Sequence, residues 1–209
     1  MVEIAFLDLK TQYLFQELGM RDNQNGDPTK LKLAVAGLLS DKQFLFYDES
    51  QAQELFMKLN QVDLIVGRNL IGFDYLVLQP YIKQNVIQAL QDKTFDIMLE
   101  LEKSTRCWTS LDNLYKRNLG MTKTIETLIV PKMWREGKQR EVKEYLLNDL
   151  KMTAKFFLCM IKILENLNLN TKIMVKAWLT EKSVVNNEIN TFVADKFHDL
   201  DNSNYLNQC

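Results

Sequence analysis

Short apolar runs recur along the first half of the chain and predict the strands of a sheet. The runs cover residues 3–9, 31–39, 42–48, 62–69 and 93–99, and the last of them is expected to run into a helix. They have the length of buried strands, and turn-forming Asn, Gly, Asp and Pro residues lie around them. Only the residues around 40–42 separate the second run from the third, which predicts a β-hairpin.

Elsewhere the apolar residues fall at the spacing of three and four that is typical of an amphipathic helix. The predicted helices cover residues 50–60, 72–82, 109–120 and 139 to about 166. Pro80 is expected to bend or end the second helix. The segment 121–138 contains Pro131 and Gly137 and is expected to be irregular.

The order of these elements is three strands, a helix, a strand, a helix, a strand and then helices. A hairpin sheet that is extended by a parallel strand through a crossover helix predicts an α/β fold with a mixed sheet. We expect residues 1–165 to form this domain. Residues 166–209 are expected to form a helical, partly flexible C-terminal extension with a frayed, Asn-rich end.

Composition narrows the functional classes. The chain has 209 residues, of which 46% are apolar and 25% charged, as in an ordinary globular protein. A protein that coats duplex nucleic acid is usually more basic than this chain, whose net charge is −1, so any nucleic-acid contact should be confined to a cleft. There is no basic segment followed by an apolar leader and no apolar run of membrane-spanning length, so we expect a cytoplasmic protein without a membrane segment.

The numbers and positions of cysteine and histidine argue against several kinds of structural and catalytic site. The three cysteines are widely spaced and include no CxxC pair, which argues against a disulfide framework and a zinc ribbon. His198 is the only histidine, so Ser-His-Asp, Cys-His and multi-histidine metal sites are poor explanations. Any catalysis must rest on carboxylates.

Acidic residues stand at the ends of three predicted elements. Asp8 ends the first strand, Asp74 follows the strand at 62–69, and Asp149 lies on the long helix one turn after Tyr145. Converging carboxylates can hold Mg²⁺ or Mn²⁺, and two such ions about 3.5–4 Å apart can clamp a phosphodiester. A tyrosine nearby could orient the attacking water. Taken singly, each acid is better explained as a helix cap or a solvated strand end, and Tyr145 as a core residue.

In combination, these residues resemble the DEDD 3′–5′ exonucleases of the RNase H-like superfamily. The order is D-x-(E) on the first strand, N-x-x-x-F-D after a central strand and Y-x-x-x-D on a late helix, and the tyrosine marks the DEDDy branch. The segments DLIVGRNLIGFDYLVLQPYI, TFDIMLELE, SLDNLYKRNLG and MWREGKQREVKEYLLNDLKMT are similar to the RNase H-like exonuclease domains found beside bacterial DEAD-box helicases. The resemblance covers residues 3 to about 160 and implies a mixed five-stranded sheet with flanking helices.

The resemblance also implies an activity and roles for individual residues. The activity is hydrolysis at the 3′ end of single-stranded DNA or RNA with two Mg²⁺ or Mn²⁺ ions. Asp8, Asp74 and Asp149 match the metal ligands, with Asp8 bridging both ions, and Tyr145 matches the residue that positions water.

Further matches surround these four residues. Asn69 and Phe73 match the residues that shape the turn and wall beside the third acid. Trp134 and Gly137 match a W-x-x-G element, for which plain packing is a competing explanation. Asp96 lies in a recurrent TFD segment and is expected to be structural rather than a ligand.

Position 10 departs from the pattern, since the chain has Lys10 where the family has its second acid, a glutamate. An ammonium group about 4 Å from a divalent cation costs several kcal/mol. Three alternatives stay open at this point. The chain could bind nucleic acid without cutting it, it could keep a weak one-metal or Mn²⁺-dependent activity, or the lysine could be a recent or introduced change.

Two other regions could contact partners. The first is a set of basic residues around Trp134, joined by Arg68, that could contact phosphates or could simply be solvated: Lys132, Arg135, Lys138, Arg140 and Lys143. Lys10 itself could also touch the substrate strand. The second is the C-terminal extension, which could dock on a protein partner such as a helicase. A non-catalytic binding or scaffold protein and an RNase H-like endonuclease remain the alternative classes.

Overall fold

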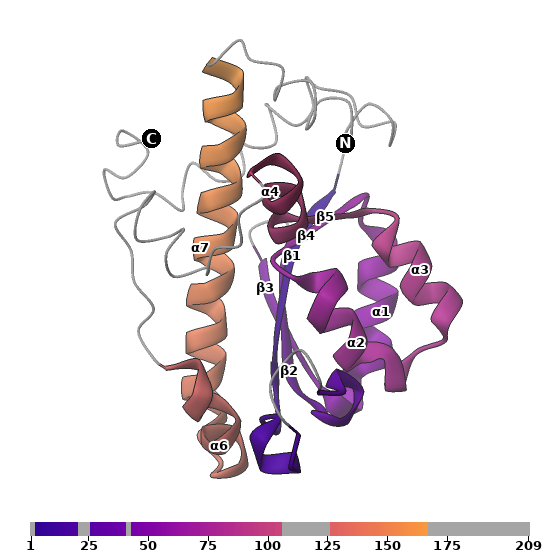
Figure 1. The fold of residues 1–209 in the computed structure, drawn as a ribbon, viewed down its shortest axis with the longest axis vertical. Helices are drawn as coiled ribbons and strands as arrows, with labels where there is room; N and C mark the ends of the chain where they lie inside the picture. Colours follow the sequence, from indigo (N-terminus) through magenta and orange to yellow (C-terminus); the bar gives the residue numbers. More distant parts are fainter. Residues whose placement is uncertain (1–2, 21–25, 41–42, 106–125, 167–209) are drawn as a thin grey trace.

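A computed structural model describes residues 3–20, 26–40, 43–105 and 126–166 (Figure 1). Its centre is a five-stranded sheet in the order β3-β2-β1-β4-β5. The strands are β1 (Ile4–Thr11), β2 (Leu33–Ser40), β3 (Gln43–Asp48), β4 (Leu64–Gly67) and β5 (Thr94–Asp96). β2 is antiparallel to β1 and β3, whereas β4 is parallel to β1 and β5. The predicted mixed five-stranded sheet is therefore confirmed.

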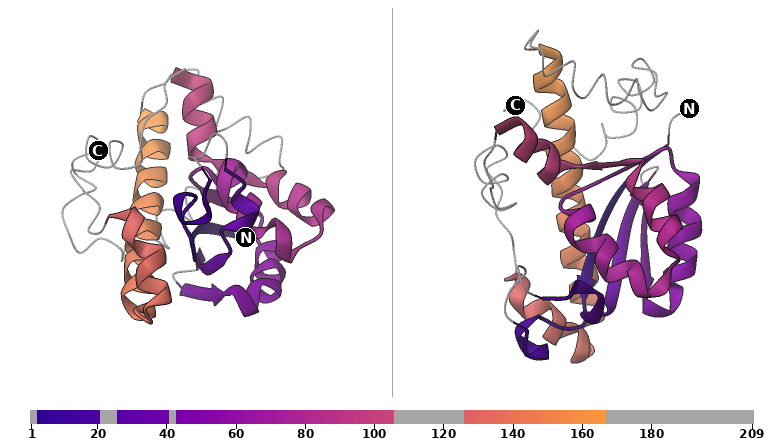
Figure 2. Two further views of the ribbon diagram at one scale, coloured as in Figure 1. Left: turned by 60° about the horizontal axis from the view of Figure 1, so that its bottom comes forward. Right: turned by 45° about the vertical axis from the view of Figure 1, so that its right-hand side comes forward.

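Helices cover both faces of this sheet. They are α1 (Ala52–Gln61), α2 (Tyr75–Leu78), α3 (Gln84–Gln91), α4 (Ile97–Thr105), α6 (Val130–Arg135) and α7 (Gln139–Asn166). Figures 1 and 2 show α1, α2 and α3 on one face and the long α7 across the other. Among the described residues, no helix is both long and apolar enough to cross a membrane.

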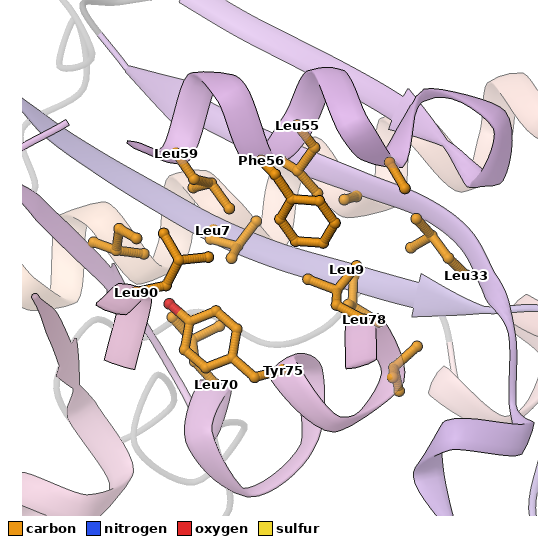
Figure 3. Packing of buried hydrophobic residues seen from close by; sticks show 14 of the residues in the cluster. Leu7, Leu9, Leu33, Leu55, Phe56, Leu59, Leu70, Tyr75, Leu78 and Leu90 are labelled. Carbon is orange, nitrogen blue, oxygen red and sulfur yellow. The ribbon is translucent and has the colours of Figure 1, made fainter. Parts of the chain in front are cut away.

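The central strand β1 shows why two layers of helices are needed. Its side chains alternate between the faces, as strand geometry requires. Ile4 and Phe6 pack in the core beneath α7, whereas Leu7 and Leu9 pack in the core beneath α1, α2 and α3 (Figure 3). Because both faces of β1 are apolar, each must be covered.

Gly37 on β2 allows α7 to approach the sheet closely. A Cβ atom at this position would lie 2.7 Å from Cδ1 of Leu150 and 2.9 Å from Cγ of Leu146. Gly37 also pairs with Asp8 of β1 in the antiparallel register. The close approach therefore brings the middle of α7 against the part of β1 that carries Asp8.

The observed strands and helices differ from the predicted ones in four places. β1 continues to Thr11, beyond the expected end at residue 9, so Lys10 lies inside the strand. The predicted helix at 72–82 is divided into a π-helical turn (Leu70–Asp74), α2 and a 3₁₀ turn (Gln79–Tyr81) that contains Pro80. A proline ring is tolerated only in the first turn of a regular helix. The helix therefore ends before Pro80, and a new turn begins there.

The other two concern helices. α3 was not predicted, although Ile87 and Leu90 are buried one turn apart on it. The segment 121–138 is not irregular throughout, since it contains α6, whose first turn accommodates Pro131. Gly137 then takes a left-handed conformation with φ +81° before α7 begins. The predicted helix at 109–120 and the C-terminal extension lie outside the described residues.

Candidate functional site

The site begins on β1, where Asp8 and Lys10 stand two residues apart. They therefore point to the same face as Ile4 and Phe6, the face that α7 covers. On α7, Tyr145 and Asp149 are four residues apart and share the helix face turned to the sheet. Both are buried, with exposed fractions of 2% and 1%.

Lys10 joins the strand to the helix. Its Nζ donates to Oδ2 of Asp8 at 2.7 Å and to Oδ2 of Asp149 at 2.8 Å. The exposed fraction of the side chain is 9% for Lys10, 2% for Asp149 and 28% for Asp8. The same Nζ lies 5.0 Å from the centroid of the Tyr145 ring, within the range of a cation–π contact. The ammonium group is thus enclosed by two carboxylates and an aromatic ring.

The charge of Lys10 follows from this enclosure. Burial by itself would lower the pKa of a lysine, because it disfavours the charged form. The carboxylates of Asp8 and Asp149 outweigh burial, and the net result is that the pKa of Lys10 is raised above its usual value of 10.5. Lys10 is therefore a permanent cation at physiological pH.

Asp74 reaches the same region from the side of β4, the strand that is parallel to β1. It ends the π-helical turn that follows β4, and this turn starts after Asn69 in a left-handed conformation with φ 59°. Asp96 at the end of β5 holds the turn, because it accepts from the backbone N–H groups of Asn69 at 2.8 Å and Ile71 at 3.0 Å. At Gly72, a Cβ would lie 2.5 Å from Oδ1 of Asn69, so a larger residue there would displace the Asn69 side chain. Asp96 is structural, as the sequence indicated.

The carboxyl group of Asp74 is poorly satisfied. Its exposed fraction is 4%, and its Oδ1 has no hydrogen-bond partner among the described residues. Burial raises the pKa of Asp74 well above its usual value of 3.8, and the nearby negative charge of Asp8 raises it further. A buried oxygen without a partner is costly, so such groups concentrate where a ligand is bound or chemistry occurs.

A cavity of about 330 Å³ opens beside these groups. Seven of the predicted site residues line it: Asp8, Lys10, Arg68, Asn69, Phe73, Asp74 and Asp149. Its apolar wall includes Phe15, whose ring meets Phe73 edge-on at a centroid distance of 6.3 Å. The three acids therefore converge on one cavity from β1, from the turn after β4 and from α7.

Tyr145 does not line this cavity but contacts a residue that does. Its hydroxyl lies 3.1 Å from Oγ1 of Thr127, in the 3₁₀ turn (Thr127–Ile129) that precedes α6. Thr127 itself lines the cavity. Sequence reasoning did not single out Thr127, because nothing in the spacing of two residues 18 positions apart indicates that they meet.

Trp134 and Arg135 do not line the cavity. Trp134 packs against the core beneath α7, in agreement with the packing explanation. The Arg135 guanidinium forms an ion pair with Glu17, donates to the backbone oxygen of Gln12 and lies 4.9 Å from the centroid of the Tyr13 ring. The hydrogen bond from Arg135 lowers the pKa of Glu17. In this arrangement Arg135 ties α6 to the segment after β1.

The other basic residues of this region are interleaved with acids. Glu136 lies 3.7 Å from Lys132 and 2.8 Å from Lys138, and Arg140 donates to Glu144 at 3.0 Å. The stretch is therefore less positive than its lysines and arginines alone indicate.

The side chains, as placed, do not fit a divalent cation. In the part of the chain that the structure describes, no group of three or more His, Cys, Asp or Glu residues is arranged to hold a metal ion. The Lys10 ammonium lies between Asp8 and Asp149, where two of the expected ligands would meet a cation. The two-ion site implied by the family resemblance stays a prediction.

Comparisons with known proteins bear on the fold. No protein-family model matches the chain, and no curated protein matches it in sequence. Among solved structures, it is similar to the family B DNA polymerase from the hyperthermophilic archaeon Pyrobaculum calidifontis, with a TM-score of 0.54 and 16% sequence identity. The match covers 78% of this chain but 25% of the polymerase. The chain therefore shares its α/β fold with a part of a DNA polymerase.

Proposed function

We propose that this chain is an RNase H-like domain of the 3′–5′ exonuclease type that binds the 3′ end of single-stranded DNA or RNA, and that Lys10 suppresses its hydrolysis. The observation that carries the proposal is the position of the Lys10 ammonium, 2.7 Å from Asp8 and 2.8 Å from Asp149. An exonuclease of the DEDDy type would carry a carboxylate on this strand position.

The arrangement of the acids supports the nuclease-type assignment. Asp8, Asp74 and Asp149 come from three separate elements and border one cavity, in the order of the DEDDy motif. Tyr145 lies one helical turn before Asp149, where the family has its water-positioning tyrosine. The mixed sheet and the likeness to a part of a DNA polymerase agree with this assignment.

The surroundings of the cavity support binding of a nucleic-acid end. Phe73 and Tyr13 line the cavity and offer aromatic surfaces for bases, and Arg68 lines it as a cation for phosphate. Leu128 also lines the cavity with 62% of its surface exposed. The contact is local, which agrees with the net charge of −1 for the whole chain.

Suppression by Lys10 follows from charge. A glutamate at this position would add a ligand, whereas the lysine removes a ligand and occupies oxygens of two others. A divalent cation about 4 Å from the ammonium would be repelled by several kcal/mol. The stem of Lys10 starts within β1 and is buried, so the side chain is held in place.

The test is degradation of a 5′-labelled single strand in the presence of Mn²⁺, with binding followed by fluorescence anisotropy. The unaltered chain is expected to bind DNA or RNA without shortening it. Lys10→Glu is expected to remove nucleotides from the 3′ end, and adding Asp149→Ala should abolish the cleavage. Lys30→Glu, an exposed lysine paired with Asp27, is the matched charge control and should stay inactive.

Failure is equally well defined. If folded Lys10→Glu cuts neither DNA nor RNA, the exonuclease-type site is wrong for this chain. If a closed circular strand is cut, the endonuclease alternative replaces it. If the unaltered chain binds no single strand, the scaffold alternative is favoured.

A second candidate function is weak hydrolysis with a single cation. The observation that favours it is the unpartnered Oδ1 of Asp74 close to Asp8, whose side chain is more than a quarter exposed. This function requires slow 3′ trimming by the unaltered chain in Mn²⁺ that Asp74→Asn removes.

A further inference from the structure

The buried ion cluster on β1 and α7 has the composition of a cation site whose cation is part of the chain. Two carboxylates, from Asp8 and Asp149, accept from one ammonium, and the third acid, Asp74, lines the same cavity. Both contact lengths lie in the range of charge-assisted N–H···O hydrogen bonds. The ammonium group therefore neutralises carboxylates that would otherwise need another cation.

We infer that Lys10 is the resident cation of this acidic site and replaces a divalent ion in holding β1 and α7 together, so that the site forms without metal. The inference deepens the proposed function, on which it rests for the identity of the acids. Its test contains no nucleic acid, so the two can fail independently.

Backbone pairing makes Lys10 suited to this role. The residue pairs with Val35 of β2 inside the sheet, and a register irregularity follows directly between Lys10 and Thr11. The strand fixes the start of the lysine stem, and α7 fixes Asp149 in the core. A lysine side chain that is held at its stem and at its ammonium group stays in place as long as the chain is folded. A bound metal ion, in contrast, would exchange with solvent.

The arrangement makes a prediction about ions that a plain salt bridge does not make. Removal of the ammonium leaves three acids around one cavity without their internal cation. A divalent cation should then bind and restore the stability that the lysine supplied, because carboxylate oxygens are the ligands such ions prefer. If Lys10 only formed a salt bridge, its mutation would also destabilise the protein, but added metal would not restore the lost stability.

The experiment is thermal unfolding of four purified proteins, each in EDTA and in increasing Mn²⁺. The unaltered chain is expected to melt at the same temperature in all conditions. Lys10→Met should melt several degrees lower in EDTA and should regain most of this loss as Mn²⁺ is added. Lys10→Met/Asp149→Asn should show no regain, because a ligand has been removed.

Lys58→Met is the matched control. Lys58 also forms an ion pair from a partly buried position, with Glu3 at 3.0 Å, but lies away from the cavity. Its variant should lose stability without any recovery in Mn²⁺.

Two results would overturn the inference. The first is a rise in the melting temperature of the unaltered chain with Mn²⁺, or direct Mn²⁺ binding to it in calorimetry, since the lysine would then not exclude the ion. The second is folded Lys10→Met that gains nothing from Mn²⁺. The calorimetric arm needs no variant, so it decides the question even if Lys10→Met does not fold.

Discussion

Two buried aspartates, Asp96 at the end of β5 and Asp74 at the end of the turn after β4, have opposite environments. Their exposed fractions are 2% and 4%. Asp96 accepts from the backbone N–H groups of Asn69, Ile71 and Met98 at 2.8–3.0 Å. Asp74 keeps an oxygen without a hydrogen-bond partner among the described residues and has a raised pKa. Burial alone therefore does not distinguish a structural acid from a site acid, whereas hydrogen-bond satisfaction does.

The position of Asp74 also depends on Asp96. Two of the three N–H groups that Asp96 accepts from, those of Asn69 and Ile71, belong to the turn that ends at Asp74. The satisfied acid thus supplies the rigidity that holds the unsatisfied acid beside Asp8. Its stabilisation offsets part of the cost of the unpaired oxygen.

The largest effect is expected from Asp96→Ala. This change leaves three backbone donors without their acceptor, and each buried donor left unpaired costs about 1–3 kcal/mol. We expect the free energy of unfolding to fall by about 3–5 kcal/mol in urea denaturation. Asp63→Ala is the control, because Asp63 accepts one exposed hydrogen bond, from the backbone of Glu3. Equal losses in the two variants would mean that the hydrogen bonds of Asp96 contribute no more to stability than the exposed hydrogen bond of Asp63.

A smaller effect is expected from Asn69→Ala. Asn69 has φ 59°, a left-handed conformation that alanine adopts at a cost of about 1 kcal/mol and glycine at almost none. Asn69→Ala should therefore lower the free energy of unfolding by about 1 kcal/mol more than Asn69→Gly does. If the two variants are equally stable, the Asp96 hydrogen bonds alone hold the turn.

The smallest effect, of opposite sign, is expected from Asp74→Asn. The folded-state pKa of Asp74 is raised above 3.8, so folding favours its protonated form. The stability that this form contributes is fully present below pH 3.8 and is lost as the pH rises through the folded-state pKa. Asparagine cannot ionise, so the variant should melt slightly higher than the unaltered chain at pH 8. This advantage should shrink toward pH 4, and its absence at pH 8 would mean that Asp74 is better satisfied than its contacts indicate.

Local sequence patterns predicted most of the sheet but missed helices where the pattern is short. All five strands were predicted, because each overlaps a short apolar run. α3 was missed because only a few apolar residues mark it, and α6 because Pro131 and Gly137 were interpreted as breakers of structure. In fact proline fits the first turn of a helix, and the glycine ends one.

The sequence by itself determined which residues could form the site. Asp8 lies on an apolar strand, and the spacing of Tyr145 and Asp149 places them on one helix face whatever the rest of the chain does. The placement of these acids depends on the periodicity of strands and helices, which is a local property of the backbone. The family resemblance, in turn, identified Lys10 as the departure from a carboxylate pattern.

Tertiary structure decided how these residues are paired. Lys10 meets Asp149 across 139 positions of sequence, Arg135 meets Glu17 across 118, and Asp74 keeps an unpaired oxygen in the cavity. The contact of Lys10 with Asp149 depends on how α7 packs on β1 and β2, which in turn depends on the missing side chain at Gly37 and on the core around it. No periodicity encodes a contact of this range, so only the folded chain shows that the Lys10 ammonium lies between Asp8 and Asp149.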